Sequence, residues 1–227
     1  MGSTNSAVSP LLGREEAVPI AMLLAFAGGY LDAYTWIIHG VMANAQTANL
    51  VLLWVHASAG NWVEALHFVP PMIAFAFGIV VAAWLRRAAG ERAGVISILI
   101  EILMLIAVGI IHNRLSDLAG TLGISFVAAI QTAVFTKVQG VAYSSVMITG
   151  NLRQAIENLF AALSGGGLFG EFRRSGIFAT LCVTFGVGAA AGAFATKAIP
   201  NLALCLPVLA LLIVLVLCQS QRREAHA

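Results

Sequence analysis

Six stretches of apolar residues, each about as long as a helix that crosses a lipid bilayer, are spread along the 227-residue chain. Such a helix needs about 20 mostly apolar residues to cross the hydrocarbon region. The six predicted spans are 18–38, 66–85, 94–111, 121–140, 176–196 and 200–218. This pattern predicts an all-α fold: a polytopic membrane helix bundle with about six transmembrane helices.

The composition excludes a soluble domain. Hydrophobic residues make up 60% of the chain and charged residues only 10%, and the mean hydropathy is +0.93. A soluble domain carries about 25% charged residues, so this chain has too little polar surface for one. The 12 basic and 10 acidic residues nearly cancel, and the net charge of +2 gives no reason to expect a nucleic-acid partner. We therefore expect the lipid bilayer as the main partner.

The basic residues fall almost entirely on one side of the predicted bundle. If the N-terminus is cytoplasmic, only Arg114 and Lys197 lie outside. The basic residues placed inside are Arg14, Arg86, Arg87, Arg92, Lys137, Arg153, Arg173, Arg174, Arg222 and Arg223. This division follows the positive-inside rule, and it predicts that both termini are cytoplasmic.

One transmembrane domain, residues 18–218, is expected between two cytoplasmic tails, 1–17 and 219–227. The first tail is polar and lacks the features of a cleavable signal, so we expect it to be disordered. The cysteines lie inside apolar segments without C-x-x-C spacing, and we interpret them as small buried hydrophobes. They are Cys182, Cys205 and Cys218. We predict neither a bound metal nor a cofactor.

Two further segments, 43–62 and 144–167, share the pattern T-x-N-L before an apolar helical stretch. The matching residues are Thr47, Asn49 and Leu50 in the first segment, and Thr149, Asn151 and Leu152 in the second. Each segment follows the first span of a three-span half, so the halves are about 18–111 and 121–218. Because three is odd, such a repeat is inverted across the membrane, as in many secondary transporters.

These two segments have two interpretations. They are half-helices that enter the membrane, or amphipathic helices that lie on its surfaces. A Thr or Asn at the start could cap each helix, whose free N–H groups attract anions or carbonyl groups. Arg153 and Glu157, spaced i and i+4, would form an ion pair and favour a surface or protein-lined position.

The chain resembles the YoaK-like bacterial inner-membrane proteins, a family of unknown function. The resemblance covers about residues 18–218 and rests on the segments G-x-x-D-A-Y-T, N-A-Q-T-x-N-L and T-G-N-L-R-Q. Ala48 is a departure, because it stands where relatives have glycine in the first T-x-N element. The resemblance implies a multi-pass protein of the bacterial inner membrane with a supposed transport role, and it supplies no substrate.

Asp32 lies beyond the middle of the first span, where a carboxylate costs about 2.5–3.5 kcal/mol to insert. It is therefore expected to face other helices or a wet cavity. Gly28 and Gly29 leave room nearby for a close neighbour, and hydroxyls are offered by Tyr30, Tyr34 and Thr35. Two roles are open: a residue that exchanges a proton in step with solute binding, or a structural acceptor of hydrogen bonds. For the structural role, the candidate donors are a half-helix start, Asn44, Gln46 and Asn49.

Glu101 is a second acid near the middle of the third span, among bulky aliphatic residues. It is either a second proton or cation site or a buried acid bonded across a packing seam, or at a subunit contact. The candidate partners across the seam are Gln131, Thr132, Thr136 and Lys137.

A polar series is predicted on the fourth span, which is the counterpart of the first span in the repeat. Its members are Gln131, Thr132, Thr136, Lys137 and Gln139. We expect the series to face Asp32 around a pseudo-twofold axis, a common place for a solute site. Lys137 has a second interpretation, as a residue whose ammonium group reaches the inner interface.

Four histidines fall near the outer ends of spans but lack the spacing of metal ligands, and we interpret them as separate interfacial residues. They are His39, His56, His67 and His112. Gly188 and Gly192 form a G-x-x-x-G pair, which we assign to close packing within the bundle. Six spans are half of a common twelve-span transporter layout, so a homodimer is expected.

The sequence contains no nucleophile elbow, Walker loop, zinc-protease or dinucleotide-binding motif, so an enzyme is disfavoured. The leading hypothesis is a transporter of an unidentified small solute, coupled to a proton. Its candidate binding residues are Asp32, Tyr30, Tyr34, Thr35, Asn44, Gln46, Thr47, Asn49, Gln131, Thr132, Thr149, Asn151 and Arg153. The alternatives are a channel-like or structural membrane protein and, more weakly, a membrane-embedded enzyme.

Overall fold

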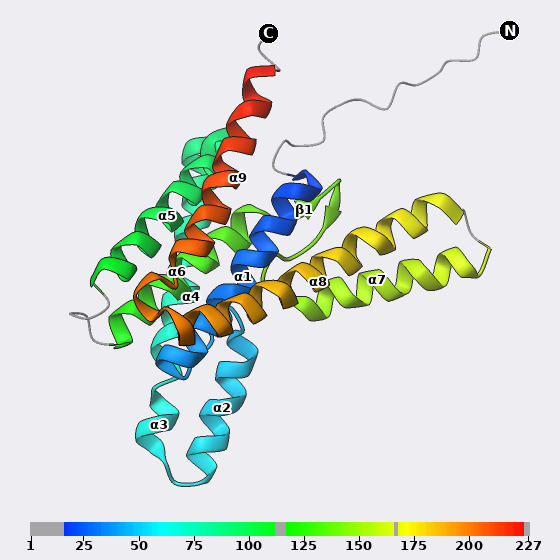
Figure 1. Cartoon of the computed structure of the whole chain (residues 1–227). Helices are drawn as coiled ribbons and strands as arrows, with labels where there is room; N and C mark the ends of the chain where they lie inside the picture. The colour runs from blue at the N-terminus through cyan, green and yellow to red at the C-terminus, as the bar shows by residue number, and fades with distance from the viewer. Residues whose placement is uncertain (1–15, 112–116, 166–167, 225–227) are drawn as a thin grey trace, which may run out of the picture.

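The computed structural model describes residues 16–111, 117–165 and 168–224, with side chains left out at a few helix ends. The described chain is almost entirely helical (Figure 1). The longer helices are α1 (Val18–His39), α4 (Val69–Ala89), α5 (Ala93–Ile111), α6 (Asp117–Val134), α8 (Leu168–Ala198) and α9 (Cys205–Glu224). The shorter ones are α2 (Gln46–Ser58), α3 (Trp62–Leu66) and α7 (Ile148–Leu163), with 3-10 turns η2 (Gly90–Arg92) and η3 (Pro200–Leu202).

The ends of α1 and the start of α4 follow from residues that the sequence places there. Pro19 stands in the first turn of α1, where the missing N–H of proline costs nothing. Gly40 ends α1 in the left-handed conformation, with φ of 68°, and its N–H donates to the Trp36 carbonyl. Pro70 starts α4 in the same way, directly after the short helix α3.

Helix α1 lies at the centre of the bundle and contacts helices from the middle and the C-terminal part of the sequence (Figure 1). It packs against α8 and α9 and, less extensively, α6. Helix α6 in turn packs against α4 and α5, and α5 packs against α9. The short helices α2 and α7 contact α4 and α8, respectively, and form two arms that leave the bundle in different directions.

Glycines allow the two most extensive helix contacts to bring backbone against backbone. In the contact between α1 and α8, Gly188 lies on the Phe26 carbonyl, and a Cβ on Gly192 would clash with the Tyr30 carbonyl oxygen at 2.6 Å. In the contact between α4 and α6, Gly78 lies on the Phe126 carbonyl in the same way. The assignment of the G-x-x-x-G pair to packing within the bundle therefore agrees with the structure.

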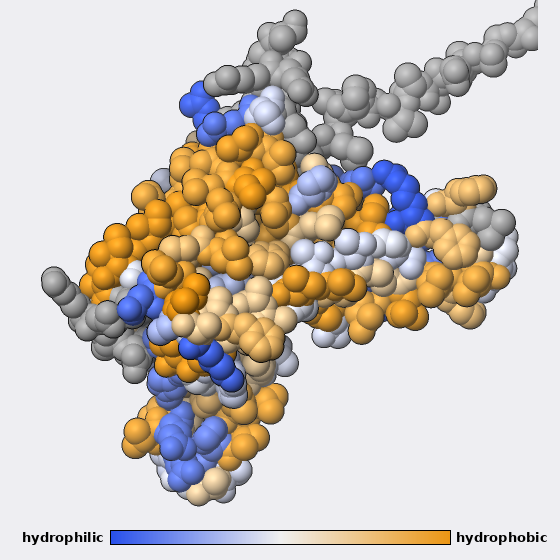
Figure 2. All heavy atoms as spheres, in the orientation of Figure 1, coloured by the Kyte–Doolittle hydropathy of each residue, from blue (hydrophilic) through white to orange (hydrophobic). Residues whose placement is uncertain are grey.

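The outer surface of the bundle is apolar. Figure 2 shows hydrophobic residues over most of the visible face, with hydrophilic ones limited to a few clusters. Large side chains such as Val80, Trp84, Ile110 and Phe194 are mostly exposed. Such a surface is unfavourable in water and suits the hydrocarbon of a bilayer.

Four helical stretches of the described chain are long and apolar enough to cross a membrane: Val18–His39, Trp62–Ile111, Phe169–Ala198 and Pro200–Ser220. Six spans were predicted, and the difference has two sources. The second stretch contains both α4 and α5, and α6 contributes only a shorter apolar helix, Ala119–Val134. The predicted fold class, an all-α membrane helix bundle, is confirmed.

The predicted fourth span, 121–140, is wrong at its C-terminal end. Helix α6 ends at Val134, and the chain then forms a hairpin of two strands, β1 (Lys137–Val138) and β2 (Val141–Ala142). Gln139 and Gly140 both have positive φ, as a two-residue hairpin turn requires. The Glu16 carboxylate accepts from the Gly140 N–H at 2.6 Å, so the start of the chain helps to hold this turn.

Candidate functional site

The chain after α1 turns back and packs along the C-terminal half of that helix. We call residues 40–45 the first loop. The Asp32 Oδ1 atom accepts a hydrogen bond from the backbone N–H of Asn44 at 2.7 Å, and Thr35 Oγ1 accepts one from the backbone N–H of Ala43 at 3.0 Å. Two side chains of α1 thereby fix the approach to α2. Asn44 is one of the predicted structural partners of Asp32, and the bond comes from its backbone.

The Asn44 side chain reaches the middle of α1. Its Nδ2 atom donates to the Gly28 carbonyl oxygen at 2.9 Å, and Gly28 lies midway along the 22-residue helix. Asn44 is only 1% exposed, and its Oδ1 atom finds no hydrogen-bond partner within the described part of the chain. Buried amide oxygens are nearly always paired, so this atom is a candidate contact for a bound molecule.

A second loop, residues 143–147, leads from the hairpin to α7 and meets α1 at the same residue. A Cβ on Gly28 would lie 2.9 Å from the Ser145 carbonyl oxygen and 3.0 Å from a Val146 methyl group. Ser145 is almost fully buried, and its Oγ atom lies 2.8 Å from Gln131 Nε2. The prediction that the glycines of α1 leave room for a close neighbour is therefore correct. Both loops converge on Gly28.

The asparagines of the two T-x-N elements make the same pair of hydrogen bonds. Asn49 Oδ1 accepts from the Met42 N–H at 3.0 Å and its Nδ2 donates to the Met42 carbonyl at 2.7 Å. Asn151 Oδ1 accepts from the Ser144 N–H at 3.3 Å and its Nδ2 donates to the Ser144 carbonyl at 2.6 Å. Each asparagine thus closes its loop by holding one residue through both backbone groups.

The predicted capping role of these elements is wrong. The residues at the N-cap positions are Ala45 and Met147, and neither helix has a side-chain cap hydrogen bond. Thr47 and Thr149 lie inside the first turn and are exposed, so they do not line the meeting point of the loops. Gln46, also predicted, supports the first loop: its Nε2 donates to the Ala43 carbonyl at 2.7 Å.

The two predicted tyrosines of α1 are buried but lie on other contacts. The Tyr30 hydroxyl donates to the Ala203 carbonyl and ties α1 to the chain that enters α9. The Tyr34 ring packs edge-on against the His39 ring, with centroids 6.3 Å apart. These interactions give both tyrosines a packing role.

Glu101 is buried between α5 and α6 and is 1% exposed. Gln131 lies beside it. With its amide nitrogen turned toward the carboxyl group, Gln131 donates to Glu101 Oε1 at 2.9 Å and Oε2 at 3.1 Å, and accepts from the Ser145 hydroxyl at 2.8 Å. Among the partners expected for Glu101, Gln131 is thus present, whereas Lys137 is an exposed residue of β1.

The remaining predicted residues are spread around this centre. Thr132 is half-buried, and its Oγ1 atom has no hydrogen-bond partner among the described residues. Arg153 forms the expected ion pair with Glu157, at 3.7 Å, on an exposed face of α7. The predicted polar series on the fourth span is therefore broken: Gln131 and Thr132 belong to α6, but Thr136, Lys137 and Gln139 follow it.

The histidines near the end of α1 make separate contacts. His56 Nδ1 lies 3.0 Å from the Glu64 carboxylate and joins α2 to α3, while His67 Nε2 lies 2.7 Å from the His39 carbonyl oxygen. Among the described residues, no group of three or more His, Cys, Asp and Glu side chains is placed to hold a metal ion. His112 and residues 1–15 lie outside the described residues.

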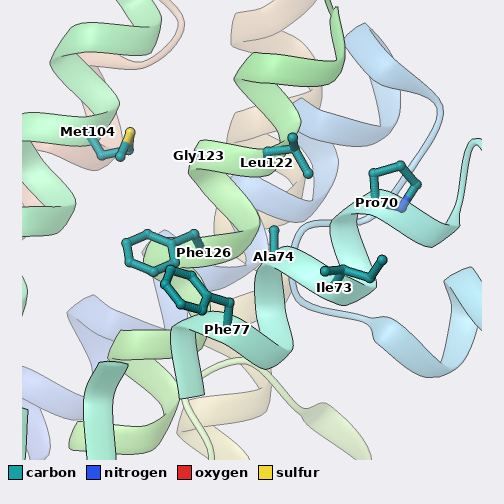
Figure 3. Close-up of a pocket in the computed structure, with 8 residues that line it drawn as sticks. All are labelled: Pro70, Ile73, Ala74, Phe77, Met104, Leu122, Gly123 and Phe126. Carbon is teal, nitrogen blue, oxygen red and sulfur yellow. The ribbon is translucent and has the colours of Figure 1, made fainter. Parts of the chain in front are cut away.

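A groove of about 530 Å³ lies between α4, α5 and α6 (Figure 3). The rings of Phe77 and Phe126 stack along one side, with centroids 5.7 Å apart, and Met104 faces them. The other lining residues are Pro70, Ile73, Ala74, Leu122 and Gly123. None of the residues that line the groove belongs to the site at Gly28. An almost wholly apolar lining also cannot orient a polar solute.

Sequence reasoning did not single out Ser145. A serine in a loop carries no signal of its own. The signal was available through the repeat, because Ser145 stands as far before Asn151 as Ala43 stands before Asn49. Both residues lie fully buried where their loops approach α1.

A comparison with known families places the whole bundle in one of them. The model of a family described as "Protein of unknown function (DUF1275)" matches residues 20–217, close to the extent of the resemblance noted in the sequence. No curated protein and no solved structure matches the chain, so the YoaK-like name stays a resemblance. The chain belongs to the DUF1275 family of membrane proteins of unknown function.

Proposed function

We propose that this protein transports a small solute in step with a proton, at a site formed where the two loops meet Gly28 beside Asp32. One observation carries the proposal: both loops lie against the midpoint of α1. Irregular backbone at membrane depth is tolerated only where protein buries it or where it lines a cavity. Secondary transporters place their solute sites at such interruptions, near the middle of the bilayer.

The packing supports two inverted halves, α1–α5 and α6–α9. If α6 repeats α1 and α8 repeats α4, the main helix contacts of α1 have counterparts in those of α6. The contact of α1 with α8 then corresponds to that of α6 with α4, and α1 with α9 corresponds to α6 with α5. The glycine contacts agree, because Gly188 on Phe26 corresponds to Gly78 on Phe126. The paired bonds of Asn49 and Asn151 support the same relation.

In this arrangement α2 enters from the outer side of a bacterial inner membrane and α7 from the cytoplasmic side, with both termini inside. The basic residues support this orientation. Arg153, Arg173 and Arg174 belong to the arm of α7 and α8, and they would then face the cytoplasm. Two copies of such a six-span chain would give the common twelve-span layout.

The polar groups at Gly28 favour a solute with hydrogen-bond donors. Asp32 contributes a carboxylate that is 8% exposed, and Asn44 contributes a buried, unpaired amide oxygen. Both are acceptors. A proton on Asp32 would weaken its attraction for a donor group, so binding of the solute and of the proton would compete.

Proton flux into liposomes tests the role of Asp32. A pH-sensitive dye inside the vesicles would report flux evoked by amines, amino acids, sugars and nucleosides added one at a time. A solute that evokes flux with the native protein should evoke none with Asp32→Asn, and Glu157→Gln, an exposed acid, is the control. If Asp32→Asn leaves the flux intact, Asp32 is a structural acceptor and this mechanism fails.

Accessibility of the two helix starts tests the pathway without a known solute. Cys182, Cys205 and Cys218 are first replaced by serine, and a cysteine is then placed at Gln46 or at Ile148. A charged thiol reagent should label Gln46→Cys from the outer side and Ile148→Cys from the cytoplasmic side. Labelling of both from one side contradicts the inverted arrangement, and labelling of neither contradicts an aqueous pathway.

A further inference from the structure

The Gln131 amide lies between Glu101 and Ser145, and its two ends are within hydrogen-bond distance of these side chains in either orientation of the amide. In one, Nε2 donates to Ser145 Oγ at 2.8 Å and to the Leu24 carbonyl at 3.3 Å, and the amide oxygen faces the Glu101 carboxyl group. In the other, Nε2 donates to both Glu101 oxygens, at 2.9 and 3.1 Å, and the Ser145 hydroxyl donates to the amide oxygen.

The two orientations match the two protonation states of Glu101. An amide oxygen can face a carboxyl group favourably only if that group carries a proton to donate. An amide nitrogen facing both oxygens is the arrangement that an ionised carboxylate needs. One side chain can therefore hydrogen-bond the carboxyl group in either state by turning over.

No charged side chain holds Glu101 in the ionised state. Helix α5 packs against α6 and α9 and, near its start, against α4 and η2. The described side chains of α6 (119–134) and α9 (205–220) include no charged residue, and the titratable ones on α9 are Cys205 and Cys218. An unpaired carboxylate in an apolar interior is costly, so the ionised form of Glu101 depends on the Gln131 amide.

The charged groups on the other neighbours of this network are remote along the sequence. Arg86 and Arg87 end α4, and Glu91 and Arg92 lie in η2. At 1.5 Å per residue, Arg92 is about 13 Å before Glu101 along the chain's helical axis. On α1, whose Leu24 carbonyl Gln131 reaches, the charged residue is Asp32, about 12 Å further along that helix.

We propose that Glu101 is a proton-binding site, and that rotation of the Gln131 amide transmits its protonation state to Ser145 in the loop before α7. When the Glu101 carboxyl group releases its proton to water, no other covalent bond changes. The amide turns its nitrogen toward the carboxylate, and the Ser145 hydroxyl changes from acceptor to donor. Because the Ser145 carbonyl lies against Gly28, this change occurs at the meeting point of the two loops.

The site deepens the proposed function, since it would give the pathway a proton site on the α7 side in addition to Asp32 on the α2 side. Its test uses no solute and no transport, so its failure is distinguishable from failure of the transport proposal. Infrared difference spectra between acidic and alkaline pH, recorded from the protein in nanodiscs, report carboxylic-acid and amide C=O bands separately.

The native protein should lose a buried carboxylic-acid band as the pH rises, together with a shift of a glutamine side-chain band. Glu101→Gln should lose both changes. Asp32→Asn is the matched control, and it should keep the glutamine shift. A Glu101 band that persists over the whole pH range at which the protein stays folded would overturn the proposal, and so would a glutamine band that does not respond to pH.

A second measurement guards against misfolding of the Glu101 variant. Gln131→Leu removes the amide and should abolish the glutamine shift, while the acid band moves toward the frequency of an unbonded carboxylic acid. Hydrogen exchange in residues 144–151, corrected for the intrinsic effect of pH, should depend on pH in the native protein but not in Gln131→Leu. Equal pH dependence in the two proteins would contradict transmission through the amide.

Discussion

The two arms of the molecule share one pattern of hydrogen bonds to the backbone but differ in the side chains around it. In both arms an asparagine closes a buried loop, and both loops meet Gly28. The first loop is held by an ionisable group, Asp32. The second is held by neutral side chains, Gln131 and Ser145, behind which lies Glu101. The backbone geometry is thus the same in the two arms, while the acidic groups are distributed unequally.

The helices that follow the loops, α2 and α7, also differ in the polarity of their exposed side chains. Helix α2 exposes apolar residues such as Val51 and Val55, which suits contact with lipid or a partner helix. At the matching places α7 carries Arg153 and Glu157, whose ion pair needs a polar environment. If the two halves are the proposed inverted repeat, their loops have stayed equivalent while the helices that follow them have adapted to different surroundings.

The largest effect is expected where the backbones of two helices touch. Gly188→Leu should prevent the contact of α1 with α8, and Gly78→Leu that of α4 with α6, because each side chain would overlap a backbone carbonyl. We expect each substitution to cost about 3 kcal/mol, the upper end of the usual range for overpacking, seen as loss of the monodisperse protein after extraction. Gly186→Leu, in open space on α8, is the control and should fold. If only one of the two variants fails, the halves are not equivalent in packing.

The next largest loss of stability is expected when the hydrogen bonds of Asn49 or Asn151 are removed. Asn49→Ala would leave the N–H and carbonyl of Met42 unpaired in a buried loop, at a cost of about 2–4 kcal/mol. Asn151→Ala should cost somewhat less, because its bond from the Ser144 N–H is longer. Thermal unfolding in detergent measures both, and Asn158→Ala, which loses one bond within α7, should cost about 1 kcal/mol or less. A neutral result for Asn49→Ala would show that water replaces the side chain.

The unequal distribution of acidic groups can be tested by comparing substitutions at Asp32 and at Thr132. The offset that brings Phe26 to Phe126 also brings Asp32 to Thr132. Asp32→Asn should lower stability by about 1 kcal/mol, because the amide replaces one of the two carboxyl oxygens near the Asn44 N–H with a hydrogen-bond donor. Thr132→Val should change stability by less than about 0.5 kcal/mol, because its hydroxyl has no partner among the described residues. A larger cost for Thr132→Val than for Asp32→Asn would reverse this assignment.

The smallest effect concerns the surface of α7. Arg153 is 70% exposed, so Arg153→Gln should change the unfolding temperature by an amount equivalent to less than about 0.5 kcal/mol. High salt should have an equally small effect on the native protein. A cost well above this value would indicate that lipid head groups or a second copy of the chain cover this face of α7 and interact with Arg153.

Much of the fold could be predicted because hydropathy is a local property of the chain. The positions of α1, α5 and α9 follow from runs of apolar residues, and Pro19 and Gly40 mark the ends of α1. The two T-x-N elements were also visible, because a repeated pattern needs no knowledge of contacts. The end of α6 was missed because a span of about 20 residues was expected, whereas the helix ends after 18 residues and the chain turns at Gln139 and Gly140.

By itself, the sequence determined that this chain is a membrane helix bundle and that two related segments lie between its spans, since both follow from composition and from a local pattern. The tertiary structure decided what those segments touch. It placed Asn49 and Asn151 on the loops rather than on the helix ends, brought both loops to Gly28, and set Gln131 between Glu101 and Ser145. Hydrogen-bond partners are chosen by proximity in space, and the Gln131 amide and the Leu24 carbonyl are 107 residues apart in the chain.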